Sequence, residues 1–178
     1  MAKISRWDLN YYSESDYWKN RAHGKIWEYR VLASKTIFLS HSHKDKKLAT
    51  GLANLLASLN IDLYIDWQDN DLPGVTNRET AEQIKSKIKT ADIVMLLATD
   101  NSMKSRWVPW EIGIADSSLG EGRIVIVPMQ ESNDDFYGNE YLQIYRRLEY
   151  DDIKGLRLFE PQYEHVSDDF SDYLLKLG

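Results

Sequence analysis

Trp107 and Glu111 stand four residues apart in the segment 105–111, Ser-Arg-Trp-Val-Pro-Trp-Glu. The segment follows an apolar, strand-like run at residues 92–98 and begins a helix-like stretch. On a helix, this spacing places the indole and the carboxylate on one face, one turn apart. An aromatic plane beside a fixed carboxylate suits a flat, cationic ligand whose reaction develops further positive charge. This pair of side chains is therefore the first candidate for chemistry.

Short apolar runs that alternate with helix-like segments predict the elements that position this pair. Strands are predicted at residues 36–40, 61–65, 93–98, 124–128 and 156–159. Helices are predicted at residues 48–59, 76–88 (with Thr76 and Glu79 as a capping box), 141–148 and 170–177. Such alternation is typical of an α/β fold with helices on both faces of a parallel sheet. We therefore predict a flavodoxin-like three-layer sandwich with a five-stranded parallel sheet in the order 2-1-3-4-5.

Residues 1–34 form an aromatic, highly charged leader, in which apolar spacing predicts a helix through residues 18–31. We expect this N-terminal helical extension to cover one side of the core, and residues 35–178 to form one α/β domain. The leader lacks the apolar run of a signal peptide, and no stretch of the 178 residues is suited to span a bilayer. The chain has no cysteine, which excludes disulfides and a cysteine nucleophile and favours a cytoplasmic location.

The predicted strand order places a ligand site near the Trp107–Glu111 pair. In the order 2-1-3-4-5 the switch point lies between the first and third strands, and ligands bind beyond their carboxyl ends. Those ends lead into two polar stretches, residues 40–45 and residues 100–104. The pair follows the second stretch directly. Fold geometry and side-chain chemistry therefore indicate the same place.

Charge and ligand spacing exclude several other functions. The net charge is −6, so the chain lacks the basic surplus that favours nucleic acid or an anionic membrane. His41 and His43 form an isolated His-x-His on a polar loop, which is more typical of solvated side chains than of a metal site. The acidic residues 66–71 lack the glutamate and spacing of a calcium loop. We therefore predict no metal site.

With its motifs taken in order, the sequence resembles a TIR domain, the Toll/interleukin-1 receptor module that also occurs in plants and bacteria. Residues 37–42 with Asp45 resemble the first box of the family, and residues 66–74 resemble the loop after the second strand. Ser102, Ser105 and residues 107–111 resemble the segment that carries the catalytic glutamate in NAD-cleaving members. The resemblance covers residues 35–159, and the leader-bearing form is more similar to a bacterial standalone TIR protein than to a receptor tail.

The resemblance implies cleavage of the nicotinamide–ribose bond of NAD, which is then a substrate rather than a cofactor. Glu111 would hydrogen-bond the nicotinamide ribose and stabilise an oxocarbenium-like transition state. The residues that would bind the substrate are Phe38, Ser40, His41, Asp45, Asp66, Trp67, Leu72, Asn101, Ser102, Trp107 and Trp110. Some members place an arginine just after the first strand, where this chain has His-Ser-His. Lys44 or Arg106 could take over phosphate recognition.

The same resemblance implies a role in antiphage defence of the Thoeris type. A standalone TIR protein would then respond to a phage-derived trigger, self-associate through TIR–TIR contacts and make a nucleotide signal for a separate effector protein. The sequence leaves open whether the product is linear, cyclic or conjugated ADP-ribose. The alternative is a non-catalytic TIR–TIR interaction module. A phosphoacceptor receiver is disfavoured, because the first strand ends in Ser-His-Ser rather than in an acidic pair.

Overall fold

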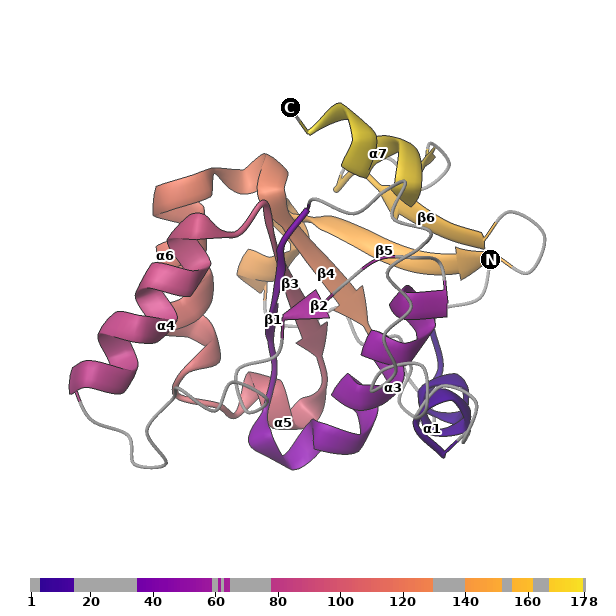
Figure 1. Cartoon of the computed structure of the whole chain (residues 1–178), viewed down its shortest axis with the longest axis horizontal. Helices are drawn as coiled ribbons and strands as arrows, with labels where there is room; N and C mark the ends of the chain where they lie inside the picture. Colours follow the sequence, from indigo (N-terminus) through magenta and orange to yellow (C-terminus); the bar gives the residue numbers. More distant parts are fainter. Residues whose placement is uncertain are drawn as a thin grey trace, which may run out of the picture.

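The computed structural model describes residues 4–14, 35–58, 61, 63–64, 78–129, 140–151, 155–161 and 167–177. In this part of the chain seven strands form one sheet, in the order β2-β1-β3-β4-β5-β6-β7 (Figure 1). The strands are β1 (Ile37–Ser40), β2 (Leu63–Tyr64), β3 (Ile93–Ala98), β4 (Ile124–Pro128), β5 (Arg146–Asp151), β6 (Gly155–Phe159) and β7 (Ser167–Asp169). Neighbours among the first five are parallel, whereas β6 and β7 pair antiparallel. The predicted fold class is therefore confirmed, and the first four predicted strands lie in the predicted order 2-1-3-4.

Helices cover both faces of this sheet. The α-helices are α1 (Arg6–Glu14), α3 (Lys46–Ser58), α4 (Arg78–Thr90), α5 (Asp100–Met103), α6 (Val108–Leu119) and α7 (Phe170–Lys176). Short 3-10 helices are η1 (His43–Asp45), η3 (Glu121–Arg123) and η4 (Glu140–Ile144). Figure 1 shows α4 and α6 on one side of the central strands and α3 with α1 on the other. None of the helices in the described residues is long and apolar enough to cross a membrane.

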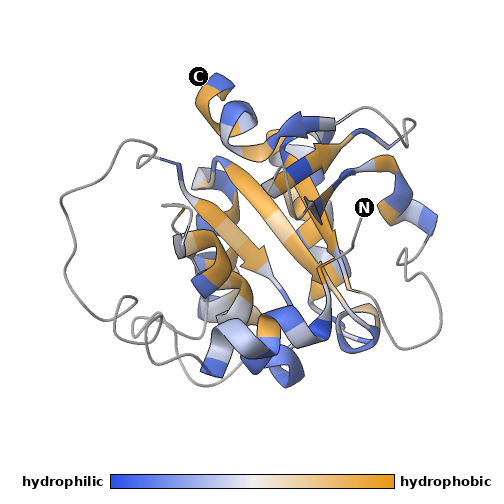
Figure 2. Cartoon of the chain, turned by 90° about the vertical axis from the view of Figure 1, so that its right-hand side faces the viewer, coloured by the Kyte–Doolittle hydropathy of each residue, from blue (hydrophilic) through white to orange (hydrophobic). Residues whose placement is uncertain are grey.

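The central strands are buried on both faces, which explains their continuous apolar runs. Every residue of β1, β3 and β4 is buried, and hydropathy colouring shows mainly apolar strands at the centre of the molecule (Figure 2). Alternate side chains of β1 enter different apolar clusters. Ile37 and Leu39 join the cluster beneath α1 and α3, and Phe38 joins the cluster beneath α4 and α6.

Part of the leader packs directly on the domain. Ile4 and Leu9 are 1% and 0% exposed and belong to the same apolar cluster as α3. The two backbones meet at Gly51, where a Cβ atom would lie 2.0 Å from the carbonyl oxygen of Leu9. Only a residue without a Cβ allows α1 to lie this close to α3. The helix predicted at residues 18–31 lies outside the described residues, as do Thr76 of the capping box and the site residues Asp66, Trp67 and Leu72.

The helix predicted at residues 141–148 is wrong. This segment forms η4 and then the first half of β5. Tyr141 and Ile144, on the supposed buried stripe, are 37% and 53% exposed, whereas Leu148 is fully buried. Pairing with β4 on one side and β6 on the other has overridden the local helical spacing. Between η4 and β5, burial and then the carboxylate of Asp116 raise the pKa of Tyr145 to about 12.

Residues 156–159, predicted as the fifth parallel strand, belong instead to β6, which runs antiparallel to β5. Only three residues separate β5 from β6, too few for the crossover that a parallel pair needs. The predicted strand number was therefore too low, and the sheet is mixed. Gly155 begins β6 with a φ of 76°, a conformation that favours glycine.

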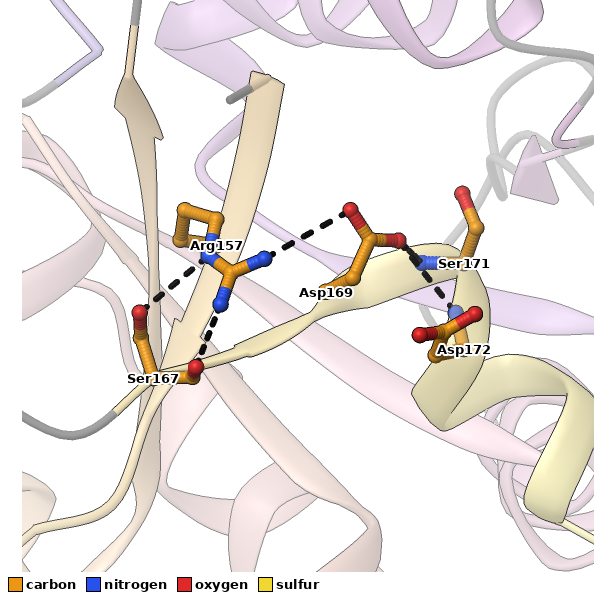
Figure 3. Close-up of polar contacts among 5 residues, drawn as sticks. All are labelled: Arg157, Ser167, Asp169, Ser171 and Asp172. Atoms are coloured by element: carbon orange, nitrogen blue, oxygen red, sulfur yellow. Dashed lines mark hydrogen bonds and ion pairs between the residues drawn. The ribbon is translucent and has the colours of Figure 1, made fainter. Parts of the chain in front are cut away.

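Arg157 on β6 joins the two antiparallel strands β6 and β7 through its side chain (Figure 3). Its guanidinium donates to the hydroxyl of Ser167 at 3.1 Å and to the carbonyl oxygen of the same residue. It also forms an ion pair of 3.7 Å with Asp169, whose other carboxylate oxygen caps α7 by accepting from the backbone N–H groups of Ser171 and Asp172. One arginine thus links β6, β7 and the start of the last helix.

Candidate active site

The segment 105–111 leads into α6 and includes its first turn, as the sequence predicted. The hydroxyl of Ser105 accepts from the backbone N–H of Trp107 at 3.2 Å, and the carbonyl of Trp107 accepts from the N–H of Glu111 at 2.9 Å. Pro109 lies in the first turn, where its missing N–H costs nothing. The Glu111 carboxylate therefore lies in the first turn of α6, where the helix dipole favours a negative charge.

Glu111 is buried against the end of β1. Its side chain is 5% exposed, and its Oε2 atom accepts a hydrogen bond of 2.5 Å from the hydroxyl of Ser40, which is 1% exposed. Ser40 shares its face of β1 with Phe38, so its side chain points toward the α4 and α6 side. A hydroxyl 71 positions away in the sequence thus holds one oxygen of the carboxylate. Such a fixed carboxylate can stabilise positive charge that develops on a ligand.

A second buried carboxylate lies at the same edge of the sheet. Asp45, 3% exposed, accepts from the Thr99 hydroxyl at 2.5 Å and from the Asn101 amide at 2.7 Å. Thr99 also forms a capping box with Ser102 at the start of α5. The loop after β1 and the loop after β3 are therefore joined by side chains. Figure 1 shows α5 at this carboxyl edge of the central strands.

The two indoles predicted to bind the substrate differ in environment. Trp107 is partly buried and packs against the apolar cluster beneath α6, whereas Trp110 is 38% exposed. Their rings meet edge to face, with centroids 5.2 Å apart. This arrangement lets the packed indole hold the exposed one in place. An exposed aromatic surface therefore lies within one helical turn of Glu111.

The histidines after β1 also differ in environment. His41 is 8% exposed and its Nδ1 atom lies 3.1 Å from the carbonyl oxygen of Leu39, while His43 is exposed. Their ring centroids are 6.2 Å apart. Within the described ranges no group of three or more histidine, aspartate or glutamate side chains is placed to hold a metal ion.

The structure brings together most of the predicted site residues that it describes. Ser40 contacts Glu111, Asp45 contacts Asn101, and Trp107 contacts Trp110. Phe38 and Ser102 are 1% and 0% exposed, so both lie beneath the surface and support their neighbours. Thr99 was missed by sequence reasoning. Its signal was a threonine at a strand end, three residues before a serine, the spacing of a helix cap.

These features define a doubly wound α/β domain with a buried, hydrogen-bonded carboxylate beyond the carboxyl ends of its central strands. The family model of the TIR domain matches residues 37–166. The chain belongs to the TIR domain family.

Two curated relatives are similar to this chain. One, from Bacillus cereus (strain MSX-D12), is named "Probable 3' cyclic ADP-D-ribose synthase ThsB'"; it is 33% identical over 113 residues, 61% of this chain and 58% of that protein. The other, from Cytobacillus dafuensis, is named "Putative cyclic ADP-D-ribose synthase TIR2"; it is 30% identical over 79 residues, 43% of this chain and 21% of that protein. The matched region thus spans little more than half of the first relative and about a fifth of the second.

A solved structure is also similar to this chain. It is the crystal structure of a prokaryotic SEFIR domain, with a TM-score of 0.49 and 17% sequence identity. The match covers 68% of this chain and 84% of that chain.

Proposed function

We propose that this chain cleaves the nicotinamide–ribose bond of NAD and closes the remaining ADP-ribose into a cyclic product. The observation that carries the proposal is Glu111, a buried carboxylate in the first turn of α6 with one oxygen held by Ser40. The names of the two relatives, a "probable" and a "putative" cyclic ADP-D-ribose synthase, support a cyclic product, and NAD is the substrate that the family resemblance implies.

Cleavage of the nicotinamide–ribose bond requires a fixed negative charge near the ribose rather than a strong nucleophile. Nicotinamide leaves with the electrons of the C–N bond, and the ribose C1′ atom becomes an oxocarbenium-like cation. Glu111 stabilises this cation electrostatically and accepts hydrogen bonds from the ribose hydroxyls. A hydroxyl oxygen of the same ADP-ribose then bonds to C1′ and loses its proton, which closes the ring. The exposed face of Trp110 is suited to the nicotinamide cation.

The test is nicotinamide release from NAD, with mass analysis of the second product. Glu111→Gln keeps the size of the side chain and an oxygen that can accept from Ser40, so we expect a folded protein that has lost turnover. Glu149→Gln is the matched control. Glu149 is also buried, at 8% exposed, but it lies on β5, where it forms an ion pair of 2.8 Å with Arg147.

Each outcome of this test is informative. Loss of nicotinamide release in Glu111→Gln but not in Glu149→Gln supports the proposal. Equal activity of Glu111→Gln and wild type contradicts the role of Glu111. A wild-type protein that releases no nicotinamide, even with the proposed trigger, contradicts the activity and favours the interaction module. A product of the mass of ADP-ribose, one water heavier than the cyclic form, contradicts cyclisation alone.

We also propose that the chain self-associates and makes its product as an antiphage signal of the Thoeris type. Support comes from the family resemblance and from the relatives' names. The loop 66–74, which resembles the family's loop after the second strand, lies outside the described residues. Specific activity that rises with protein concentration supports self-association. Constant specific activity over a wide dilution series, from a species that light scattering shows to be monomeric, contradicts it.

A further inference from the structure

Asp45, Thr99 and Asn101 form a hydrogen-bond cluster between the loops that leave β1 and β3. We call it the Asp45 clamp. Both carboxylate oxygens of Asp45 are used, Oδ2 by the Thr99 hydroxyl at 2.5 Å and Oδ1 by the Asn101 amide at 2.7 Å. Asp45 is 3% exposed and Thr99 is fully buried. Because a buried carboxylate is costly without donors, the two partners are needed to keep Asp45 in this position.

The clamp lies where a doubly wound fold has its crevice. β1 and β3 are adjacent and parallel, with Ser40 beside Leu96, and β2 lies on the other side of β1. The loops of two such strands diverge at the switch point and leave a crevice between them. Here the side chain of Asp45 bridges from η1 to the start of α5. Asp45 therefore links the two loops across the switch point.

We propose that Asp45 is a positioning residue and not a ligand of the substrate. It ties the η1 loop, which follows Ser40, to the α5 loop, which leads toward Trp107 and Glu111. The Ser40–Glu111 hydrogen bond joins the same two segments of chain. The clamp thus fixes the distance that this catalytic contact needs. The inference rests on the proposed function only for its kinetic part, because the clamp itself is testable on the folded protein.

A reciprocal exchange of the two side chains tests the clamp. Asp45→Asn places an amide against the amide of Asn101, and Asn101→Asp places two carboxylates together. The double variant Asp45→Asn/Asn101→Asp restores one donor and one acceptor, and Thr99 can still donate to the new amide oxygen. In urea unfolding we expect each single variant to lower the midpoint, and the double variant to recover at least half of that loss. Midpoint losses that simply add contradict the clamp, whatever the chain catalyses.

Steady-state kinetics with NAD then separates positioning from binding. Positioning predicts that Asp45→Asn lowers kcat on the order of tenfold with little change in KM, and that the double variant recovers kcat. A substrate ligand predicts a raised KM that the double variant keeps, because its carboxylate has moved to position 101. This second result overturns the inference. If wild type turns over no NAD, the proposed function fails, while the unfolding experiment still decides the clamp.

Two further variants keep the test decisive if Asp45→Asn does not fold. Asn101→Ala removes one donor at a partly exposed position, and we expect it to lower kcat in the same direction. Asn54→Ala is the matched control. The buried amide of Asn54 donates to the carbonyl oxygen of Tyr12 at 2.9 Å on the α1 side of the sheet. We expect Asn54→Ala to lower the unfolding midpoint without changing kcat; an equal loss of kcat in both variants contradicts a specific role of the clamp.

Discussion

Ser40→Ala removes a single hydroxyl, the one that holds the Glu111 carboxylate at 2.5 Å. Alanine differs from serine only by this hydroxyl and keeps the Cβ atom, so we expect the fold to persist. A hydrogen bond to a charged group contributes about 1.5–3 kcal/mol. If the transition state needs the carboxylate in this orientation, that range corresponds to about a 10- to 150-fold loss, at about 1.4 kcal/mol for each factor of ten.

The assay is steady-state release of nicotinamide, with kcat and KM determined separately. We expect the loss mainly in kcat, because the hydroxyl orients the carboxylate toward charge that develops only in the transition state. Ser13→Ala is the matched control. Ser13 is also buried, at 8% exposed, and its hydroxyl donates at 2.8 Å to the carbonyl oxygen of Asn10 within α1.

The reasoning behind this prediction can be refuted directly. A folded Ser40→Ala protein whose kcat/KM lies within twofold of wild type means that the contact with Glu111 does not matter for turnover. Equal losses in Ser40→Ala and Ser13→Ala mean that lower stability, and not the lost contact, accounts for the effect. Thermal unfolding of both variants distinguishes a change in activity from a change in stability.

Three further predictions concern substrate binding, the pH dependence of stability and helix packing. Trp107→Ala should lower kcat/KM by on the order of tenfold, and Trp7→Ala, which truncates a ring that is 72% exposed on α1, should not; equal losses in two equally stable variants contradict a binding role for Trp107. The raised pKa of Tyr145 predicts that stability falls between pH 10 and about 12, because the unfolded chain loses its phenolic proton first. Tyr145→Phe should flatten this fall in unfolding midpoints. Gly51→Ala should destabilise the protein by about 1–3 kcal/mol, because its Cβ would collide with the carbonyl of Leu9, and an unchanged melting temperature would show that α1 does not dock as described.

The central strands of the sheet were predictable because a strand that is buried on both faces has a continuous run of apolar residues. β3 and β4 have the bounds that their apolar runs predicted, and α3 follows its leucine repeat. The edge of the sheet was not predictable in the same way. The apolar residues of the segment 141–148 have helical spacing, yet its second half forms a strand because it pairs with β4 and β6. These strands are distant in the sequence or follow it, so a local pattern does not reveal the pairing. The antiparallel direction of β6 follows from its short connection to β5, which the sequence did not predict as a strand.

The candidate site was predictable as a region because topology gathers the carboxyl ends of β1 and β3. The contacts within it were not, since Ser40 and Glu111 are 71 positions apart and Asp45 and Thr99 are 54 apart. The alternation of side chains along β1 nevertheless determines one of these contacts. A slip of one residue would turn Ser40 away from α6 and place Leu39 there. The burial of Phe38 beneath α4 and α6 prevents that slip, so a core side chain two residues away determines which hydroxyl reaches the Glu111 carboxylate.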